Sequence, residues 1–207
     1  VQKLDYLKGL GITVIYLNPI FKAYSNHRYD TGDYMQIDPL LGNDADFDNF
    51  ITECERRGIA VILDGVFNHT GDDSRYFKKY YAWYNFKPFP DKYESWWGID
   101  VLPSVNESCD SYANFITGTD GVIDHWIRRG VSGFRLDVAD ELPDEFIEKI
   151  RNAAHAARAD ALIIGEVWED ASNKIAYSKR RKYLQGKELD SVMNYPLKDA
   201  IIKFLKS

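Results

Sequence analysis

The chain has 207 residues, of which 45% are hydrophobic and 28% charged, and this composition is typical of a soluble globular domain with a full core. A net charge of −6 without a basic block argues against nucleic acid or an anionic membrane as the partner. A neutral, polar ligand fits this charge better. No apolar run reaches the roughly 18 residues of a membrane span.

The two cysteines have no metal-ligand spacing. Cys54 falls on the apolar stripe of a predicted helix, so we expect a reduced core residue rather than a disulfide. This mildly favours a reducing compartment, and no signal peptide is evident, so a cytoplasmic location is favoured and secretion stays open. The chain begins without methionine inside an amphipathic pattern, and we therefore expect it to be an excerpt of a longer protein.

Short apolar runs alternate with stretches of helical spacing along the chain. The apolar runs predict strands at residues 12–17, 59–63, 133–138, 161–165 and 191–195. The stretches between them predict helices at residues 4–10, 44–58, 122–130, about 146–150, 174–184 and 197–204. Strands that are apolar on both faces and alternate with helices indicate an α/β fold with a parallel sheet covered by helices.

Three further expectations concern the polar parts of the chain. Residues 22–43 are expected to form a loop, and Asp44 to cap the helix that follows it. The cluster Lys179-Arg180-Arg181-Lys182 is expected to be the solvated face of a helix. Residues 70–115 interrupt the alternation, and 11 of the 22 positions from Tyr76 to Trp97 are aromatic. We interpret them as an inserted subdomain between barrel parts at residues 1–69 and 116–207.

Polar residues follow the predicted strands where each strand ends, at Asn18, Asp64, Asp137 and Glu166. In a parallel barrel this edge of the sheet carries the chemistry, whereas an open doubly wound sheet would use a switch point. The glycine-rich phosphate loop that would support the second option is missing.

The strand Gly133–Val138 places Arg135 and Asp137 on one face, because its apolar residues alternate with them. An arginine two residues before an aspartate favours an ionised carboxylate, as a nucleophile requires, although a buried structural ion pair explains the same pattern equally well. Asp137 and Glu166 end successive strands and can converge as the paired carboxylates that cleave a glycosidic bond. A divalent metal would also suit paired carboxylates, but no clustered ligand set has metal spacing.

Four segments resemble signature regions of one enzyme family in order and spacing. They are Asp64-Gly-Val-Phe-Asn-His69, Leu102-Pro-Ser-Val-Asn106, Gly133-Phe-Arg-Leu-Asp-Val-Ala-Asp-Glu141 and Gly165-Glu-Val-Trp-Glu-Asp170. The family that they resemble is the α-amylase family of glycoside hydrolases. The Val-Ala-Asp-Glu continuation and the segment Ser25–Tyr34 look most like its neopullulanase and cyclomaltodextrinase branch.

The resemblance implies a role for each matching residue. Asp137 would be the nucleophile that forms a covalent glycosyl-enzyme intermediate, and Glu166 the general acid that protonates the leaving oxygen and then activates water. Asp64 would be structural and join the polar network of the site. The residues that the resemblance places around the substrate are His27, Tyr29, His69 and Arg135. Without the motif, His69 and Tyr29 would more readily be packing residues.

The aromatic insertion suits the same ligand, because the flat faces of sugar rings pack on aromatic rings. Trp83, Trp96 and Trp97 are candidates, although any one of them is more simply part of the insertion's own core. In related amylases an asparagine beside the matching histidine can help to bind a structural calcium ion. The favoured branch often does without it, so Asn68 is not assigned, calcium stays open, and no cofactor is required.

The resemblance implies a (β/α)8 TIM barrel that is incomplete here, with about five β/α units corresponding to strands 2–6 and an aromatic-rich B-domain insertion after the third. The third acidic residue of the family's site, which follows a histidine at the seventh strand, has no match. We therefore expect a retaining glycosidase or transglycosidase acting on α-1,4 linked glucans, with α-1,6 linkages as a second class, in a chain with little activity by itself. The alternatives are a non-catalytic glucan-binding fragment and a metal-dependent enzyme, and the branch implies a homodimeric parent.

Overall fold

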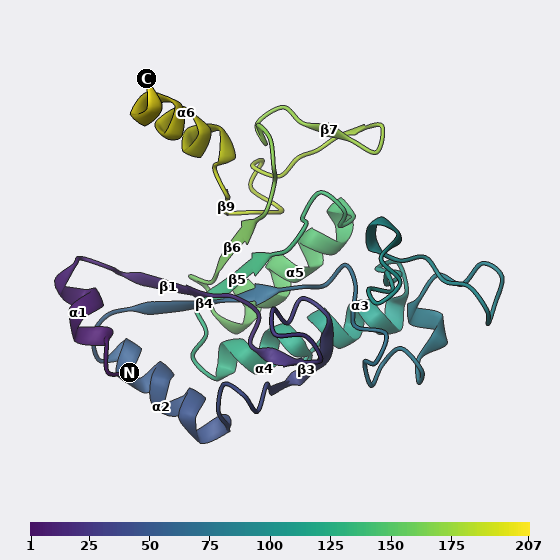
Figure 1. The fold of residues 1–207 in the computed structure, drawn as a ribbon, viewed down its shortest axis with the longest axis horizontal. Helices are drawn as coiled ribbons and strands as arrows, with labels where there is room; N and C mark the ends of the chain where they lie inside the picture. Colours follow the sequence, from purple (N-terminus) through teal and green to yellow (C-terminus); the bar gives the residue numbers. More distant parts are fainter.

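A five-stranded parallel sheet forms the centre of the molecule in the computed structural model, which describes all 207 residues. The strands lie in the order β1-β4-β5-β6-β9 (Figure 1). Their bounds are Val14–Leu17 for β1, Ala60–Gly65 for β4, Gly133–Leu136 for β5, Leu162–Gly165 for β6 and Ser191–Val192 for β9. All five predicted strands are therefore present, in the order expected for consecutive β/α units, and β9 is shorter than predicted.

Helices lie in the crossovers that connect β1, β4, β5 and β6, whereas the segment between β6 and β9 contains no helix. Their bounds are Leu4–Gly9 for α1, Asp44–Glu55 for α2, Asp110–Thr117 for α3, Val122–Arg128 for α4, Asp144–Ala157 for α5 and Tyr195–Lys206 for α6. Helix α2 packs against β4 and α5 packs against β6 (Figure 1). The cap of α2 is Asn43 rather than the expected Asp44, because Asn43 and Asp46 exchange hydrogen bonds in a capping box.

The prediction of a simple loop over residues 22–43 is wrong. Strands β2, Phe21–Ala23, and β3, Thr31–Ile37, pair there as an antiparallel hairpin. Tyr34 of β3 is fully buried and donates a hydrogen bond of 2.7 Å to the carbonyl of Val66. Polar residues interrupt the hydrophobic pattern of this stretch, so the sequence did not indicate β3. Tertiary packing, rather than the hydrophobicity of the strand itself, stabilises β3.

The prediction of a helix over residues 174–184 is also wrong. Strands β7, Ile175–Ala176, and β8, Lys179–Arg180, form a two-stranded hairpin. Tyr177 and Ser178 both have positive φ, which is the conformation of the two-residue turn that matches the twist of a hairpin. The adjacent Arg181 is buried and paired with Asp144 instead of lying on a solvated helix face.

The aromatic insertion has little regular structure. It contains the short 3₁₀ turns η1, Tyr81–Trp83, and η2, Trp96–Gly98, together with isolated β-bridges, and α3 crosses residue 115, where we expected the insertion to end. Its rings pack on one another, with Trp83 stacked 4.4 Å from Tyr80 and 5.1 Å from Phe115. Ring packing therefore takes the place of regular secondary structure in organising this part of the chain.

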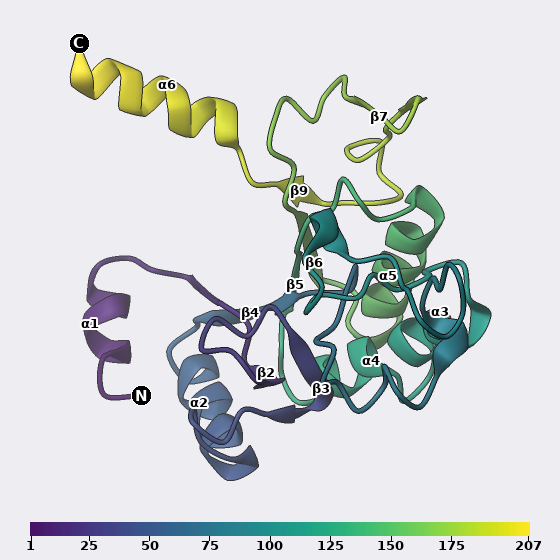
Figure 2. The ribbon, with the colours of Figure 1, turned by 45° about the vertical axis from the view of Figure 1, so that its right-hand side comes forward.

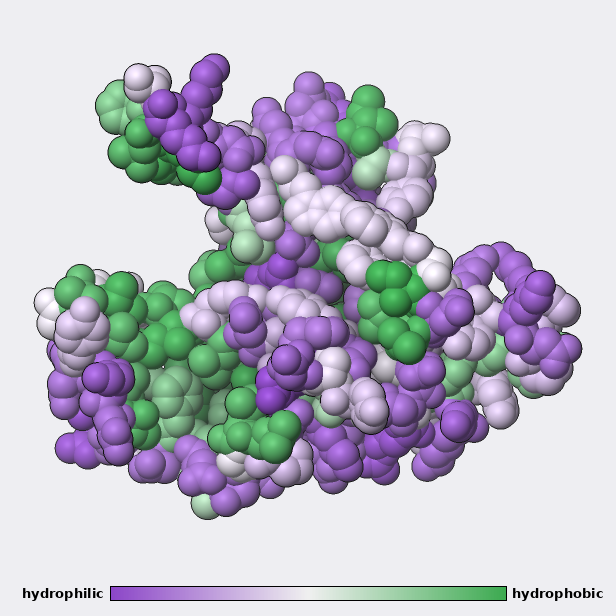
Figure 3. All heavy atoms as spheres, in the orientation of Figure 1, coloured by the Kyte–Doolittle hydropathy of each residue, from purple (hydrophilic) through white to green (hydrophobic).

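One hydrophobic cluster runs through the sheet, its helices and the insertion. Cys54 is fully buried in it and both cysteines are free, as predicted for Cys54. Apolar side chains remain exposed at both edges, on β1 and on α6, which extends away from the body and buries no residue (Figure 2; green in Figure 3). Apolar surface is thus exposed at both ends of the open sheet, and no helix has the length and hydrophobicity needed to cross a membrane.

Candidate active site

Charged side chains from three neighbouring strands meet at the carboxyl edge of the sheet. The register pairs Asp64 of β4 with Arg135 of β5, and Arg135 with Ile164 of β6, two residues before Glu166. Asp137 lies two residues beyond Arg135 on the same face of the chain. The parallel pairing therefore brings together residues that are up to 102 positions apart in the sequence, counting from Asp64 to Glu166.

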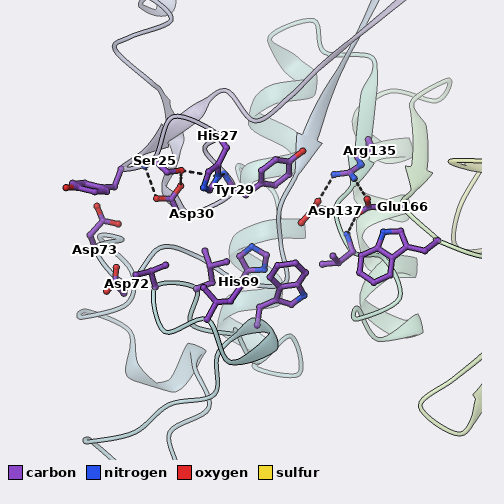
Figure 4. Close-up of a pocket in the computed structure, with 17 residues that line it drawn as sticks. Ser25, His27, Tyr29, Asp30, His69, Asp72, Asp73, Arg135, Asp137 and Glu166 are labelled. Carbon is purple, nitrogen blue, oxygen red and sulfur yellow. Dashed lines mark hydrogen bonds and ion pairs between the residues drawn. The ribbon is translucent and has the colours of Figure 1, made fainter. Parts of the chain in front are cut away.

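The guanidinium of Arg135 is the centre of this group. Its Nη1 lies 2.8 Å from Oδ1 of Asp64 and 2.6 Å from Oδ1 of Asp137, and its Nη2 lies 2.8 Å from Oε1 of Glu166. All four side chains are at most 12% exposed. Figure 4 shows Arg135 between Asp137 and Glu166, with both interactions drawn. One cation thus holds both candidate catalytic carboxylates in a nearly buried site.

The charge balance of this group differs from the sequence expectation. Three carboxylates share one guanidinium, so full ionisation would leave a buried net negative charge. Burial and, after it, the charge of Asp64 raise the pKa of Asp137 to about 7, although Arg135 acts in the opposite direction. Arg135 thus acts in the direction expected from the sequence and favours the ionised form of Asp137, but burial and the neighbouring acids outweigh it.

The carboxylate of Glu166 has two further partners. The backbone N–H of Val138 donates to Oε2 over 3.0 Å, and the hydroxyl of Tyr195 donates to Oε1 over 3.2 Å. Val138 directly follows Asp137 in the chain, so this hydrogen bond connects the two candidate catalytic residues through the backbone. Tyr195, the first residue of α6, is a site residue that the sequence reading missed.

Tyr16 is a second residue that the sequence reading missed. Its hydroxyl donates a hydrogen bond of 2.5 Å to Oδ2 of Asp64, whose carboxylate is fully buried. Asp64 is therefore fully engaged by Tyr16 and Arg135, and it does not line the pocket described below. The signal that could have found Tyr16 is its place as the only residue with a polar tip in the strand Val14–Leu17.

A pocket of about 840 Å³ opens beside the two carboxylates. Six of the residues singled out from the sequence line it, namely His27, Tyr29, His69, Arg135, Asp137 and Glu166 (Figure 4). Aromatic and aliphatic side chains supply the rest of one wall, including Trp96 and Trp168. An apolar wall combined with a few convergent polar groups is the usual construction of a site for a small organic ligand.

His69 lines this pocket, and one of its ring nitrogens is buried without a hydrogen-bond partner. The amide of Asn68 donates to its Nδ1 over 3.2 Å, which leaves the proton on Nε2, and Nε2 is buried without a partner in the chain. Burial lowers the pKa of His69 to about 4, so the ring is neutral near pH 7. The imidazole also stacks on Trp96, with ring centroids 5.3 Å apart. His69 is thus a neutral imidazole whose Nε2–H makes no hydrogen bond within the chain.

His27 and Tyr29 form the opposite side of the pocket (Figure 4). The backbone N–H of Tyr29 donates to Nδ1 of His27 over 3.1 Å, and the two rings lie 6.0 Å apart. Burial and the charge of Asp64 raise the pKa of Tyr29 to about 12, so its hydroxyl is a neutral donor at pH 7.

The three tryptophan candidates have different surroundings. Trp83 is buried in the insertion, as its structural interpretation anticipated. Trp96 lines the pocket, whereas Trp97 is 67% exposed and contacts Trp168 edge to face with ring centroids 5.4 Å apart.

No group of three or more His, Cys, Asp or Glu residues in the chain has an arrangement that could hold a metal ion. The amide nitrogen of Asn68, the residue left unassigned for calcium, is directed to His69. The structure therefore assigns no metal-binding residues, and the structural calcium ion raised from the sequence stays an open question.

The fold and the site together define a class of protein, an α/β enzyme with paired carboxylates at the carboxyl edge of parallel barrel strands. Comparison with known families assigns it further. Residues 1–207 match the family described as alpha amylase, catalytic domain. The chain belongs to the α-amylase family of glycoside hydrolases, and its five parallel strands are part of that family's (β/α)8 barrel.

Individual relatives agree with this assignment. The chain is 41% identical over 238 residues to the amylopullulanase of Thermoanaerobacterium thermosulfurigenes, covering 99% of this chain and 12% of that protein. It is 38% identical over 224 residues to the cyclomaltodextrinase of Thermoanaerobacter pseudethanolicus, covering 99% of this chain and 36% of that protein. The solved structure of a cyclic α-maltosyl-(1→6)-maltose hydrolase from Arthrobacter globiformis superimposes with a TM-score of 0.87 at 32% identity, covering 98% of this chain and 47% of that one.

These shares show that the chain spans less than half the length of each of these relatives. The relatives named here include enzymes of the neopullulanase and cyclomaltodextrinase branch that the sequence motifs had indicated.

Proposed function

We propose that the site of this chain cleaves α-glucosidic bonds by a retaining mechanism, with Asp137 as nucleophile and Glu166 as general acid and base. The observation that carries the proposal is the bridge through Arg135, which holds both carboxylates on adjacent nitrogens of one guanidinium beside the pocket. Retaining enzymes need their carboxylates about 5–5.5 Å apart, whereas inverting enzymes separate them by about 6.5–9.5 Å. A single guanidinium that contacts both carboxylates keeps them close to each other, as a retaining mechanism needs.

The reaction proceeds in two displacements. Asp137 attacks the anomeric carbon and forms a covalent glycosyl ester, while Glu166 gives its proton to the departing oxygen so that the glycosidic bond breaks. Glu166 then takes a proton from water, whose oxygen attacks the same carbon and releases Asp137. A second sugar hydroxyl in place of water gives transglycosylation. Neither step requires an organic cofactor.

The raised pKa of Asp137 is compatible with this order of events. Asp137 must be ionised to attack, and the charge of Asp64 is one of the causes that disfavour its ionised form. A bound substrate that takes part of Arg135 away from Glu166 would leave more of the guanidinium to Asp137.

The proposed substrates are α-1,4 linked glucans, with α-1,6 linkages as a second class, such as maltooligosaccharides, pullulan or cyclomaltodextrins. Relatives of this chain carry the names amylopullulanase, cyclomaltodextrinase and neopullulanase. The free Nε2 of His69 supplies a donor for a sugar hydroxyl, and the rings of Tyr29 and Trp96 supply flat apolar faces. We place His27, Tyr29 and His69 around the sugar whose bond is cleaved.

The isolated chain of residues 1–207 is proposed to have little turnover. The only acids that share Arg135 are Asp64, Asp137 and Glu166, and the third acidic residue of the family's site has no match here. Removal of one group that stabilises charge in a transition state costs about 10²–10³ in rate. For the same protein in its complete form we propose a homodimer in the cytoplasm, with secretion as the alternative.

Release of reducing sugar tests the proposal. Maltotriose, pullulan and cyclomaltodextrin are each incubated with residues 1–207 and with an extended domain, defined as this chain lengthened at both ends to complete the eight-stranded barrel. We expect turnover by the extended domain, a loss of at least about 10³-fold in Asp137→Asn and Glu166→Gln, and almost none from residues 1–207. Unchanged turnover in Asp137→Asn would overturn the assignment of the nucleophile.

A second candidate function is glucan binding without catalysis, and the apolar wall with the unpartnered His69 nitrogen favours it for the isolated chain. Titration calorimetry with maltotriose separates the two. Binding that survives Asp137→Asn, in an extended domain that shows no turnover with any of the three glucans, would support the binding function instead.

A further inference from the structure

The residue after Asp137 has an unusual backbone. Val138 is 3% exposed and has a φ of +41°, in the left-handed region that a β-branched side chain avoids. Such a conformation costs free energy and persists only where the surroundings impose it. Interactions around Val138 must therefore stabilise this conformation.

One part of the reason is Glu166 itself. The N–H of Val138 donates to Oε2 of Glu166 over 3.0 Å, and the N–H of Ala139 donates to the carbonyl of Glu166 over 3.1 Å. Both hydrogen bonds come from the turn that follows Asp137. The conformation of Val138 thus sets how Asp137 lies relative to Glu166.

The other part is a buried charge at the end of the turn. The carboxylate of Asp140 lies 2.5 Å from Nζ of Lys174 through Oδ2 and accepts a hydrogen bond of 2.6 Å from the hydroxyl of Tyr183 through Oδ1. Asp140 is 9% exposed and Tyr183 is fully buried. We call these three residues, Asp140, Lys174 and Tyr183, the Asp140 cluster.

Lys174 and Tyr183 both belong to the segment that follows Glu166 in the chain. This segment makes further hydrogen bonds to the turn that follows Asp137. Arg181 of the same segment donates to the carbonyls of Asp140 and Leu142 over 2.8 and 2.7 Å. Lys174 also pairs with Glu169, three residues after Glu166, as Asp140 is three residues after Asp137. The segment that follows Glu166 therefore contacts the turn that follows Asp137 at several points.

We propose that Asp140 is a positioning residue, which through Lys174 and Tyr183 keeps Val138 in its strained turn and thereby fixes Asp137 relative to Glu166. The inference rests on the proposed function, because it assigns Asp140 a part in the same reaction. Without the negative charge of Asp140, a nearly buried ammonium loses its main partner, and Val138 relaxes toward ordinary φ values. Its N–H then leaves Glu166, and the spacing of the two carboxylates becomes variable.

Hydrogen exchange at the Val138 amide tests the physical part of the inference in the 207-residue chain. The variants are Asp140→Asn, which keeps the shape, and Lys174→Met. The matched control is Arg129→Met at the residue that follows α4, which removes another largely buried cation that pairs with two carboxylates, Asp44 and Asp48 of α2. We expect exchange of the Val138 amide to become about tenfold faster in the two cluster variants and to stay unchanged in the control. Equal exchange in all three would overturn the proposal.

Kinetics in the extended domain test the functional part. A misplacement of about 1 Å can cost about 10²-fold in rate, so we expect kcat to fall at least about tenfold in Asp140→Asn and Lys174→Met, while KM changes less than about threefold. Lys174→Arg, which keeps the charge, recovers most of kcat, and Arg129→Met leaves it unchanged. A merely structural role predicts instead that kcat follows melting temperature in every variant.

The two proposals can fail separately. If Asp137→Asn abolishes turnover and Asp140→Asn leaves both kcat and Val138 exchange unchanged, only the positioning role is wrong. If Asp137→Asn retains full turnover, the proposed function is wrong, and faster exchange of Val138 in Asp140→Asn then describes a structural turn without a catalytic consequence.

Discussion

Tyr16 and Asp64 connect the first two strands of the sheet at its carboxyl edge, where the phenol donates a hydrogen bond of 2.5 Å to the buried carboxylate. Asp64 in turn holds Arg135, so this contact supports the residue that binds both candidate catalytic acids. A substitution at Tyr16 is therefore expected to affect the position of Arg135, although Tyr16 contacts neither Asp137 nor Glu166.

We predict that Tyr16→Phe lowers the free energy of unfolding by about 1 kcal/mol, since it leaves one lone pair of a buried carboxylate without a donor at a tyrosine that is itself partly exposed. Urea denaturation measures the change. Tyr6→Phe is the control, because Tyr6 is 65% exposed on α1. A Tyr16→Phe variant as stable as the parent chain would mean that water replaces the phenol at no cost.

We predict that Arg135→Met destabilises the chain by about 3–5 kcal/mol at pH 8, because it leaves Asp64, Asp137 and Glu166 buried together without a cation. At pH 5 the loss should be smaller, since the pKa values of Asp64 and Asp137 are raised and uptake of protons relieves the repulsion. Denaturation at both values of pH measures the difference. Arg128→Met, at an exposed pair with Asp124, should change stability by less than about 1 kcal/mol.

Stability is predicted to fall as the pH rises through the neutral range, and Glu107 is one of the causes. Burial raises the pKa of Glu107 from 4.5 to about 8, so the folded chain binds a proton between these values that the unfolded chain has released. The stabilisation is complete below pH 4.5 and is lost as the pH approaches 8, with a slope of at most about 1.4 kcal/mol per pH unit.

Glu107→Gln should therefore be more stable than the parent chain at pH 8.5 and similar to it at pH 4.5, as measured by thermal unfolding across the pH range. Glu94→Gln, at an exposed ion pair with Lys87, is the control. A slope that is unchanged by Glu107→Gln would show that this carboxyl is ionised in the folded chain.

We predict that His69→Phe weakens binding of maltotriose about threefold to tenfold, because the ring still stacks on Trp96 while the donor at Nε2 is lost. The loss should be the same at pH 5.5 and pH 8, since burial lowers the pKa of His69 to about 4 and the imidazole is neutral at both. Titration calorimetry measures it. A loss that appears only at pH 5.5 would indicate a charged histidine and contradict this account.

The sequence was sufficient to predict the elements that are organised by hydrophobic periodicity. The central strands β4 and β5 are buried apolar runs, and the parallel order of β1, β4, β5 and β6 follows from the helices between them. The same reasoning failed for β3 and for the β7–β8 hairpin. In those segments, strand structure depends on partners elsewhere in the chain, such as Val66 for Tyr34 and Asp144 for Arg181.

The candidate site divides in the same way. Asp137, Glu166, Arg135 and His69 lie in local motifs, so their residue types and spacing could be read directly. Tyr16 and Tyr195 lie outside these motifs, and each reaches the site from an edge of the sheet by a hydrogen bond, so the motifs did not point to them. The raised pKa of Asp137 could not be inferred from its local motif, since it depends on burial and on Asp64, which is 73 residues away in the sequence.

Trapping of the covalent intermediate identifies the residue that attacks the sugar. The extended domain carrying Glu166→Gln, which lacks the acid and base, is incubated with a fluorinated maltosyl fluoride whose reactive leaving group needs no proton. The products of proteolysis are then examined by mass spectrometry. The account predicts one glycosyl adduct on the peptide that contains Asp137, and none when Asp137→Asn is added. An adduct on any other residue would contradict the assignment of Asp137 as the nucleophile.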